Sequence, residues 1–207
     1  MFNIVVKKYG NPDILVYEKG SSQKLYQDSV RIKVNSIGVN FADILTIRGK
    51  YQERPRPPFS PGLEVSGVIT EISKKVSRFK IGDEVISIMK YGGYKTEVIV
   101  PQENTYHVPR GMALLEAGGF AVTYGTAFSA LVTKAAVKEK EVCIILGATG
   151  GVGMAAIEIA KSYGANVVAC GGDDDKLKLC KEKGANLIIN YKNGILRKQL
   201  KNSGINE

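Results

Sequence analysis

One glycine-rich segment constrains the fold of this chain more than any other feature of its sequence. The segment reads Gly147-Ala148-Thr149-Gly150-Gly151-Val152-Gly153, and it lies between the apolar run 142–146 and an amphipathic stretch at 151–163. Glycines let the backbone turn sharply and approach a ligand closely, and the free N–H groups at a helix start attract a diphosphate. The order strand, glycine loop, helix therefore predicts a dinucleotide-binding unit.

The residues expected to contact the diphosphate are Ala148, Thr149, Gly150, Gly151 and Val152. The alternative is a glycine-rich turn that binds nothing. A kinase-type phosphate loop is excluded because no Gly-Lys-Ser/Thr follows the glycines.

Strands and helices alternate around this loop. Strands are predicted at 142–146, 166–170 and 187–190, and helices at 151–163 and 174–183. This alternation implies a parallel sheet with helical crossovers. A doubly wound sheet would need about three more strands after this point. We therefore expect an open sheet edge, exposed apolar helix faces and poor stability as an isolated monomer.

The first 110 residues read differently, as short strands separated by turns. Strands are predicted at 30–34, 65–72, 85–89 and 94–100, with a short helix at 41–48 and a proline-rich loop after it. This pattern favours a small β-barrel. The segment 112–138 is predicted to be helical.

Composition argues against several other classes. The net charge is +9, but the lysines are scattered, so a nucleic-acid surface is disfavoured. One histidine and three dispersed cysteines argue against a zinc site and for buried thiols in a reducing compartment. No long apolar run indicates a membrane span, and we expect a cytoplasmic protein.

The end of the second predicted strand bears on the choice of cofactor. An acid there favours the ribose of NAD(H), and a basic group favours the 2′-phosphate of NADP(H). Asp173 supplies the acid, whereas Lys176 and Tyr191 can attract a phosphate. Helix capping explains Asp173 equally well. On physical grounds the cofactor choice stays open.

Several segments together resemble the zinc-free quinone oxidoreductase (zeta-crystallin-like) branch of the medium-chain dehydrogenase/reductase superfamily. They are Gly38–Asp43, Gly49–Tyr51, Pro61–Gly67, Gly82–Val85, the glycine loop, Lys183–Asn186 and Ile189–Tyr191. The resemblance implies an α/β plus β-barrel fold. A GroES-like domain over 1–122 would be followed by the first half of a Rossmann domain over 123–207, with the active site between them.

The resemblance also implies hydride transfer from NADPH to a quinone or another conjugated carbonyl, such as an enone. Asn40, Asp43 and Tyr51 would line the cleft near the nicotinamide, and Thr126 would contact the cofactor. No zinc is expected, because Asn40 and Leu63 stand where zinc-bearing relatives place a cysteine and a histidine. NADPH is favoured on family grounds only.

Each of these positions has a structural alternative. Asn40 and Asp43 can cap a helix, Tyr51 can be a packing anchor, and Thr126 can be an ordinary helix residue. The chain as a whole can be a non-catalytic remnant that keeps partial nucleotide binding. A homodimer that pairs through the edge of the Rossmann sheet is a further expectation.

Overall fold

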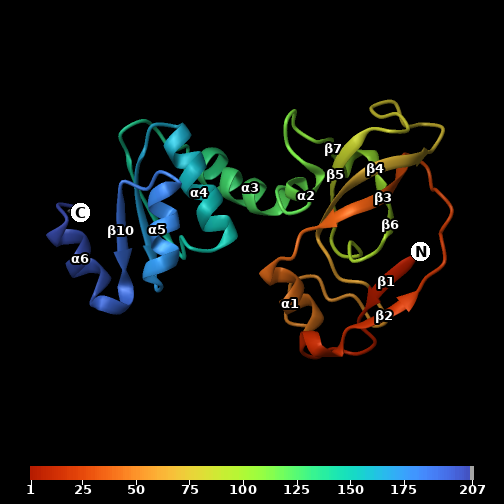
Figure 1. Cartoon of the computed structure of the whole chain (residues 1–207), viewed down its shortest axis with the longest axis horizontal. Helices are drawn as coiled ribbons and strands as arrows, with labels where there is room; N and C mark the ends of the chain where they lie inside the picture. Colours follow the sequence, from red (N-terminus) through yellow and green to blue (C-terminus); the bar gives the residue numbers. More distant parts are fainter. Residues whose placement is uncertain (206–207) are drawn as a thin grey trace. The chain divides into compact units, whose positions relative to one another are not determined.

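The computed structural model describes residues 1–205. The chain divides into two compact units, Met1–Val122 and Thr123–Glu207, which we call the barrel unit and the parallel-sheet unit (Figure 1). Each unit has its own hydrophobic core. Among the helices of residues 1–205, none has the length and apolar character needed to cross a membrane.

The barrel unit is built on a five-stranded antiparallel sheet in the order β6-β3-β4-β5-β7. Its strands are β3 (Ser29–Ile37), β4 (Glu64–Ile72), β5 (Glu84–Ile88), β6 (Glu97–Pro101) and β7 (Thr105–His107). Register shifts in the β3–β4 ladder curl the sheet. Seven strand residues and Phe79, from the segment between β4 and β5, form the core of this unit: Val30, Ile32, Val65, Ile69, Phe79, Val85, Val98 and Val100.

A two-stranded hairpin that the sequence patterns did not predict begins the chain. It consists of β1 (Phe2–Val5) and β2 (Val16–Lys19), joined through the 3-10 turn η1 (Pro12–Ile14). Backbone hydrogen bonds between Val6 and Phe59 tie the residue after β1 to the proline-rich loop. A second 3-10 turn, η2 (Gln102–Asn104), separates β6 from β7.

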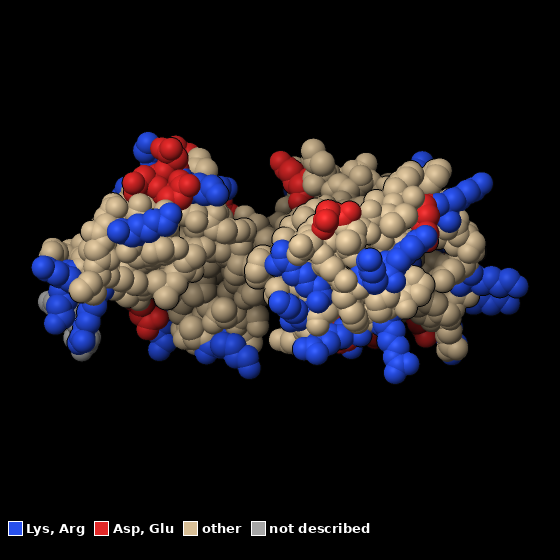
Figure 2. Space-filling view, turned by 90° about the horizontal axis from the view of Figure 1, so that it is seen from below, with Lys and Arg blue, Asp and Glu red and all other residues tan. Residues whose placement is uncertain are grey.

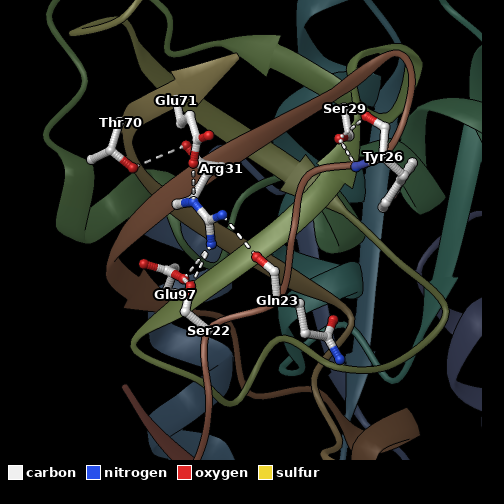
Figure 3. Close-up of polar contacts among 8 residues, drawn as sticks. All are labelled: Ser22, Gln23, Tyr26, Ser29, Arg31, Thr70, Glu71 and Glu97. Atoms are coloured by element: carbon white, nitrogen blue, oxygen red, sulfur yellow. Dashed lines mark hydrogen bonds and ion pairs between the residues drawn. The ribbon is translucent and has the colours of Figure 1, made fainter. Parts of the chain in front are cut away.

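Arg31 on β3 fastens a loop to this sheet (Figure 3). Its guanidinium donates to Glu71 on β4 and to Glu97 on β6, at 2.7 and 2.6 Å. The same group donates to the Ser22 hydroxyl and to the Gln23 carbonyl, at 2.7 and 2.8 Å. One side chain therefore connects three strands with the loop that precedes β3.

The segment 112–138, predicted to be helical, forms several short helical elements. It contains α2 (Leu114–Ala117), α3 (Ala121–Phe128) and a π-helical turn, η3 (Ser129–Lys134). The chain passes close to β3 at the end of α2. A Cβ on Gly118 would lie 1.9 Å from the Ser36 hydroxyl oxygen and 2.9 Å from its backbone carbon, so this position requires glycine. Ala136 then adopts a φ of 50°, which ends the helical run.

The parallel-sheet unit contains three parallel strands in the order β10-β9-β8. They are β8 (Val142–Leu146), β9 (Asn166–Gly171) and β10 (Leu187–Asn190). The helices are α4 (Gly151–Ser162), α5 (Asp174–Glu182) and α6 (Leu196–Asn202), with the 3-10 turn η4 (Tyr191–Asn193) before α6. The predicted class is confirmed: a β-barrel unit is followed by part of a doubly wound parallel sheet.

The two faces of this sheet are covered unequally. Residues of α4 and α5, among them Ile157 and Leu177, pack with Val167 and Ala169 of β9 on one face. On the other face α6 packs through Leu196 and Leu200 against β9 and β10. The same face of β8 stays open, so its side chains are 52, 41 and 66 % exposed at Val142, Ile144 and Leu146. This uncovered strand is the open edge that the sequence predicted.

Charged side chains are spread over the surface. In the space-filling view, basic side chains form separate groups with uncharged surface between them (Figure 2). Most of the ion pairs are between exposed partners, such as Lys90 with Glu53 and Lys178 with Asp175. Such pairs add little to stability.

Candidate functional site

The glycine loop forms the tight turn that its sequence predicts. Gly147 ends β8 with a φ of 66°, a conformation that favours glycine. The Ala148 N–H donates to the Cys170 carbonyl at 3.0 Å, which fixes the loop to β9. Gly150 is then extended and is the N-cap residue of α4.

The start of α4 is open to a ligand. Over residues 1–205, no side chain caps its first N–H groups, and Gly150, Gly151 and Val152 are exposed. A Cβ on Gly150 would meet no atom closer than the Gly147 carbonyl oxygen at 3.5 Å, so the space beside the loop is free. Uncapped N–H groups and the positive end of the helix suit a diphosphate. The residues present therefore fit the phosphates of a dinucleotide.

Gly153 serves packing rather than ligand access. It is buried, and a Cβ there would lie 2.5 Å from the Gly147 oxygen and 2.6 Å from Ala148 Cα. Both atoms belong to the backbone and cannot move aside. A glycine is therefore needed for α4 to approach the loop this closely.

The ends of the three parallel strands meet at the same edge as the glycine loop. A Cβ on Gly171, at the end of β9, would lie 2.7 Å from the Thr149 methyl group. A Cβ on Gly172 would lie 3.0 Å from the Tyr191 ring and from Lys192 Cε. Thr149 and Tyr191 are thus brought to the same strand ends, and Lys192, which the sequence patterns did not single out, lies beside them.

Asp173 caps α5, as predicted by the helix-capping interpretation of this residue. Its carboxylate accepts the Lys176 N–H at 3.0 Å. The two acids that follow are engaged too: Asp174 accepts from the Asn190 amide and Asp175 from Lys178, both at 2.8 Å. Within residues 1–205 no ion pair involves Lys176, at the start of α5, or Lys192, which lies beside Tyr191 at Gly172.

Thr126 lies on the exposed surface of α3. The α3 residue that the structure brings to the loop is Thr123, whose methyl group would lie 3.0 Å from a Cβ on Gly151. Two turns further along α4, Glu158 accepts a hydrogen bond from the Tyr124 hydroxyl and another from Lys183. The hydrogen bond to Glu158 is the main cause that raises the pKa of Tyr124 to about 12.

In the barrel unit, Asn40 and Asp43 begin α1 (Phe41–Ile47). The Asp43 carboxylate is buried and accepts the Asn40 N–H at 2.8 Å and the Gly62 N–H at 3.1 Å. The Tyr94 hydroxyl donates to it at 3.2 Å. Burial raises the pKa of Asp43, and burial together with the Asp43 charge raises the pKa of Tyr94. Asp43 therefore holds the loop at Gly62 against the start of α1.

The Asn40 side chain is directed to a second buried acid. Its amide nitrogen donates to Glu64 Oε1 at 2.9 Å, and the other Glu64 oxygen accepts the Val122 N–H at 2.9 Å. The sequence patterns did not single out Glu64. The available signal was an acid directly before the predicted strand 65–72, where burial of a charge requires partners.

Tyr51 lies half-buried on the loop after α1, where its carbonyl accepts from Arg54 at 3.2 Å. Among the described residues, no hydrogen bond joins its hydroxyl to Asn40 or Asp43. Over the same residues, no group of three or more His, Cys, Asp or Glu side chains is arranged to hold a metal ion.

Two family models match the chain. The model of the alcohol dehydrogenase GroES-like domain matches residues 26–133, and the model of the zinc-binding dehydrogenase matches residues 151–204. The curated relatives include quinone oxidoreductase-like protein 2 of Bos taurus, which is 38% identical over 184 residues, covering 88% of this chain and 53% of that protein. The quinone oxidoreductase of Homo sapiens is 31% identical, with 90% of this chain and 57% of that protein covered.

Solved structures agree with these sequence matches. The Escherichia coli quinone oxidoreductase complexed with NADPH superposes with a TM-score of 0.90 at 25% identity, covering 99% of this chain and 63% of that one. The quinone oxidoreductase of Thermus thermophilus, also solved with NADPH, gives 0.86 at 29% identity, with 99% and 64% covered. The chain spans about half the length of the curated relatives it matches.

Proposed function

Because the chain belongs to the medium-chain dehydrogenase/reductase superfamily and has quinone oxidoreductases among its relatives, we propose that it binds NADPH and reduces a quinone or another conjugated carbonyl. In this proposal the GroES-like barrel unit (1–122) contacts the substrate and the partial Rossmann unit (123–207) holds the nucleotide. A cytoplasmic location and a homodimer through the sheet edge belong to the same proposal.

One observation carries the proposal: the uncapped, exposed start of α4 after the glycine loop. A helix start whose N–H groups lack partners gains most from an anion placed against it. The glycines at 150 and 151 leave room for that anion. Buried Ala148 fixes the loop to β9 through its N–H, and the half-buried Thr149 lies beside Gly171 at the rim of the loop.

The preference for NADPH over NADH is argued from charge. Asp173, Asp174 and Asp175 all have partners in the protein, so their repulsion of a phosphate is reduced. Lys176 and Tyr191 then offer a positive charge and a hydroxyl to a 2′-phosphate. Lys192, above Gly172, adds a second positive charge.

When bound, the nicotinamide supplies a hydride. The residues of the barrel unit prepare the acceptor. A quinone is already electrophilic, so its reduction needs alignment and a donor for the oxygen that gains negative charge. Asn40 has a second amide N–H for this purpose, and the Tyr51 hydroxyl is a further donor. Asp43 does not touch the substrate in this scheme but fixes the helix start that carries Asn40.

A second candidate is a protein that binds the nucleotide and does not turn over. The observation that favours it is that the glycine loop, Thr149 and Tyr191 all belong to the parallel-sheet unit, so nucleotide binding in this candidate needs no residue of the barrel unit.

Fluorescence titration with NADPH and NADH, followed by turnover with 1,4-benzoquinone, separates the two candidates. Turnover with tighter NADPH binding supports the reductase, and binding without turnover supports the second candidate. Gly150→Leu is expected to abolish binding while the melting curve stays close to that of wild type, because the space beside Gly150 is open. An unchanged affinity for both nucleotides in this variant would remove the glycine loop from the argument.

A further inference from the structure

Glu64 is an unusual charged residue in the barrel unit. Its side chain is fully buried, with an exposed fraction of 0%. It is surrounded by donors: the Asn40 amide on one oxygen, the Val122 N–H on the other, and the Ala121 backbone N–H besides. A buried carboxylate is costly unless such partners compensate it.

These donors determine which protonation state fits. An ionised carboxylate only accepts, so it can satisfy all of them, whereas a protonated acid or a Gln amide would oppose one donor with another. The ionised state also fixes the orientation of the Asn40 amide. The atom that faces Glu64 Oε1 must be the amide nitrogen, and the amide oxygen must point elsewhere.

We propose that Glu64 is a positioning residue that orients the Asn40 amide for the substrate carbonyl and, with its other oxygen, secures the start of α3. The inference rests on the proposed function, in which the remaining N–H of Asn40 donates to the substrate. If Glu64 were neutral, the Asn40 amide could turn its oxygen toward the Glu64 carboxyl group. The remaining N–H of Asn40 would then no longer be held in place to donate to the substrate.

The surroundings of Glu64 are shaped to hold it in one place. A Cβ on Gly38 would lie 2.3 Å from Glu64 Oε1 and 2.5 Å from its Cγ. The Gly38 N–H also donates to the Glu64 carbonyl at 3.3 Å. A methyl group at position 38 would therefore displace the carboxylate without changing its chemistry.

Titration provides a test that needs no turnover. Burial is the main cause that raises the pKa of Glu64, and the Asp43 charge adds to it. Asp43 is the charged group that faces Glu64 among the described residues, and Tyr94 donates to Asp43 in turn. In ¹⁵N-labelled wild-type protein, the Asn40 side-chain amide signal should shift as pH falls from 8, with a midpoint above the usual range of a glutamate.

Variants identify the residue whose titration shifts the Asn40 signal. The signal is identified by its loss in Asn40→Ala. The transition should persist in Asp43→Asn and disappear in Glu64→Gln. In Gly38→Ala the signal should move at neutral pH, because the carboxylate is displaced. Glu116→Gln, at an exposed acid of α2, is the matched control and should leave the signal unchanged.

Kinetics with NADPH and 1,4-benzoquinone provide the second readout. Glu64→Gln should lower kcat by about 10-fold or more, as expected when an oxyanion donor is misplaced, and should leave the KM for NADPH within about twofold. The double variant Asn40→Ala/Glu64→Gln should be no slower than Asn40→Ala alone, because both changes remove the same contact.

The outcomes separate this inference from the proposed function. If the Asn40 signal follows Glu64 but wild type has no turnover, the proposed function fails and the positioning contact stands. If the wild-type Asn40 amide ignores pH, the inference is overturned even when Glu64→Gln does not fold. It is also overturned if wild type turns over and Glu64→Gln keeps its kcat.

Discussion

The carbonyl oxygen of Gly147 lies 2.5 Å from the position that a Cβ atom would take on Gly153. Gly153→Ala should therefore destabilise the parallel-sheet unit by about 1–3 kcal/mol, the usual cost of overpacking, although alanine favours helix. Chemical denaturation followed by circular dichroism measures the loss. Gly150→Ala is the matched control, because its Cβ would have ordinary contacts, and it should change the free energy of unfolding by about 1 kcal/mol at most. Equal losses of unfolding free energy in the two variants would contradict the close approach of Gly153 to Gly147.

The Arg31 contacts predict that lysine cannot replace this arginine. Arg31→Lys keeps the charge but loses the planar fork that reaches Glu71, Glu97 and the loop together. We expect a loss of about 2 kcal/mol in the free energy of unfolding, as for a lost hydrogen bond to a charged group.

The same variant should release the loop around Ser22 and Gln23. Limited proteolysis should then cut there faster than in wild type. Lys90→Met, at an exposed ion pair with Glu53, serves as control and should leave the unfolding midpoint and the cleavage pattern unchanged. A wild-type cleavage rate in Arg31→Lys would show that the loop is held by other contacts.

Asp43 should give the barrel unit an unusual dependence on pH. Burial raises the pKa of Asp43 in the folded state above its value in the unfolded chain. Protonation of Asp43 therefore stabilises the fold. This stabilisation is fully present below the pKa of the unfolded chain and is lost as pH rises through the pKa of the folded state. The stability of wild type relative to Asp43→Asn should therefore grow as pH falls from 7 toward the ordinary aspartate pKa of about 3.9. Denaturation curves of both proteins at several pH values test this. If the free energies of unfolding of the two proteins changed in parallel over this pH range, the raised pKa of Asp43 would be ruled out.

The uncovered face of β8 predicts self-association. Ile144 and Leu146 are 41 and 66 % exposed and lie beside Val142 on a sheet edge with free backbone groups. The purified chain should sediment as oligomers or aggregates at micromolar concentration. Ile144→Lys/Leu146→Glu should shift it toward monomer without lowering its melting temperature. A wild-type chain that stays monomeric at high concentration would show that the exposed face of β8 does not drive self-association.

The order of strands and helices in the parallel-sheet unit could be predicted because the signals are local. The apolar period of α4, the glycine after it and the acid before α5 each lie within a few residues of the element they define. Asp173 shows the limit of such signals. Its cap can be read from the sequence, but whether it also contacts a ribose cannot, because the same residue type serves both purposes.

Glu64 could not be assigned from the sequence because its partners are distant. Asn40 is 24 residues away and Val122 is 58 residues away, so no short pattern distinguishes this acid from a solvated one. The requirement for glycine at position 118 has the same origin, since it depends on the approach of Ser36 from β3. The hairpin of β1 and β2 was missed because only one of its eight residues, Val5, is buried, which weakens the alternation of apolar and polar residues.

The Arg31 side chain satisfies two acids and one loop at once, and this has a consequence for how the sequence can drift. Replacing Arg31 by an uncharged residue leaves Glu71 and Glu97 close together without a cation, so a lineage that loses the arginine should lose at least one of these acids as well. The length of the loop at Ser22 should change in step, because its attachment point goes with the guanidinium. Across homologues these positions should therefore covary as a set.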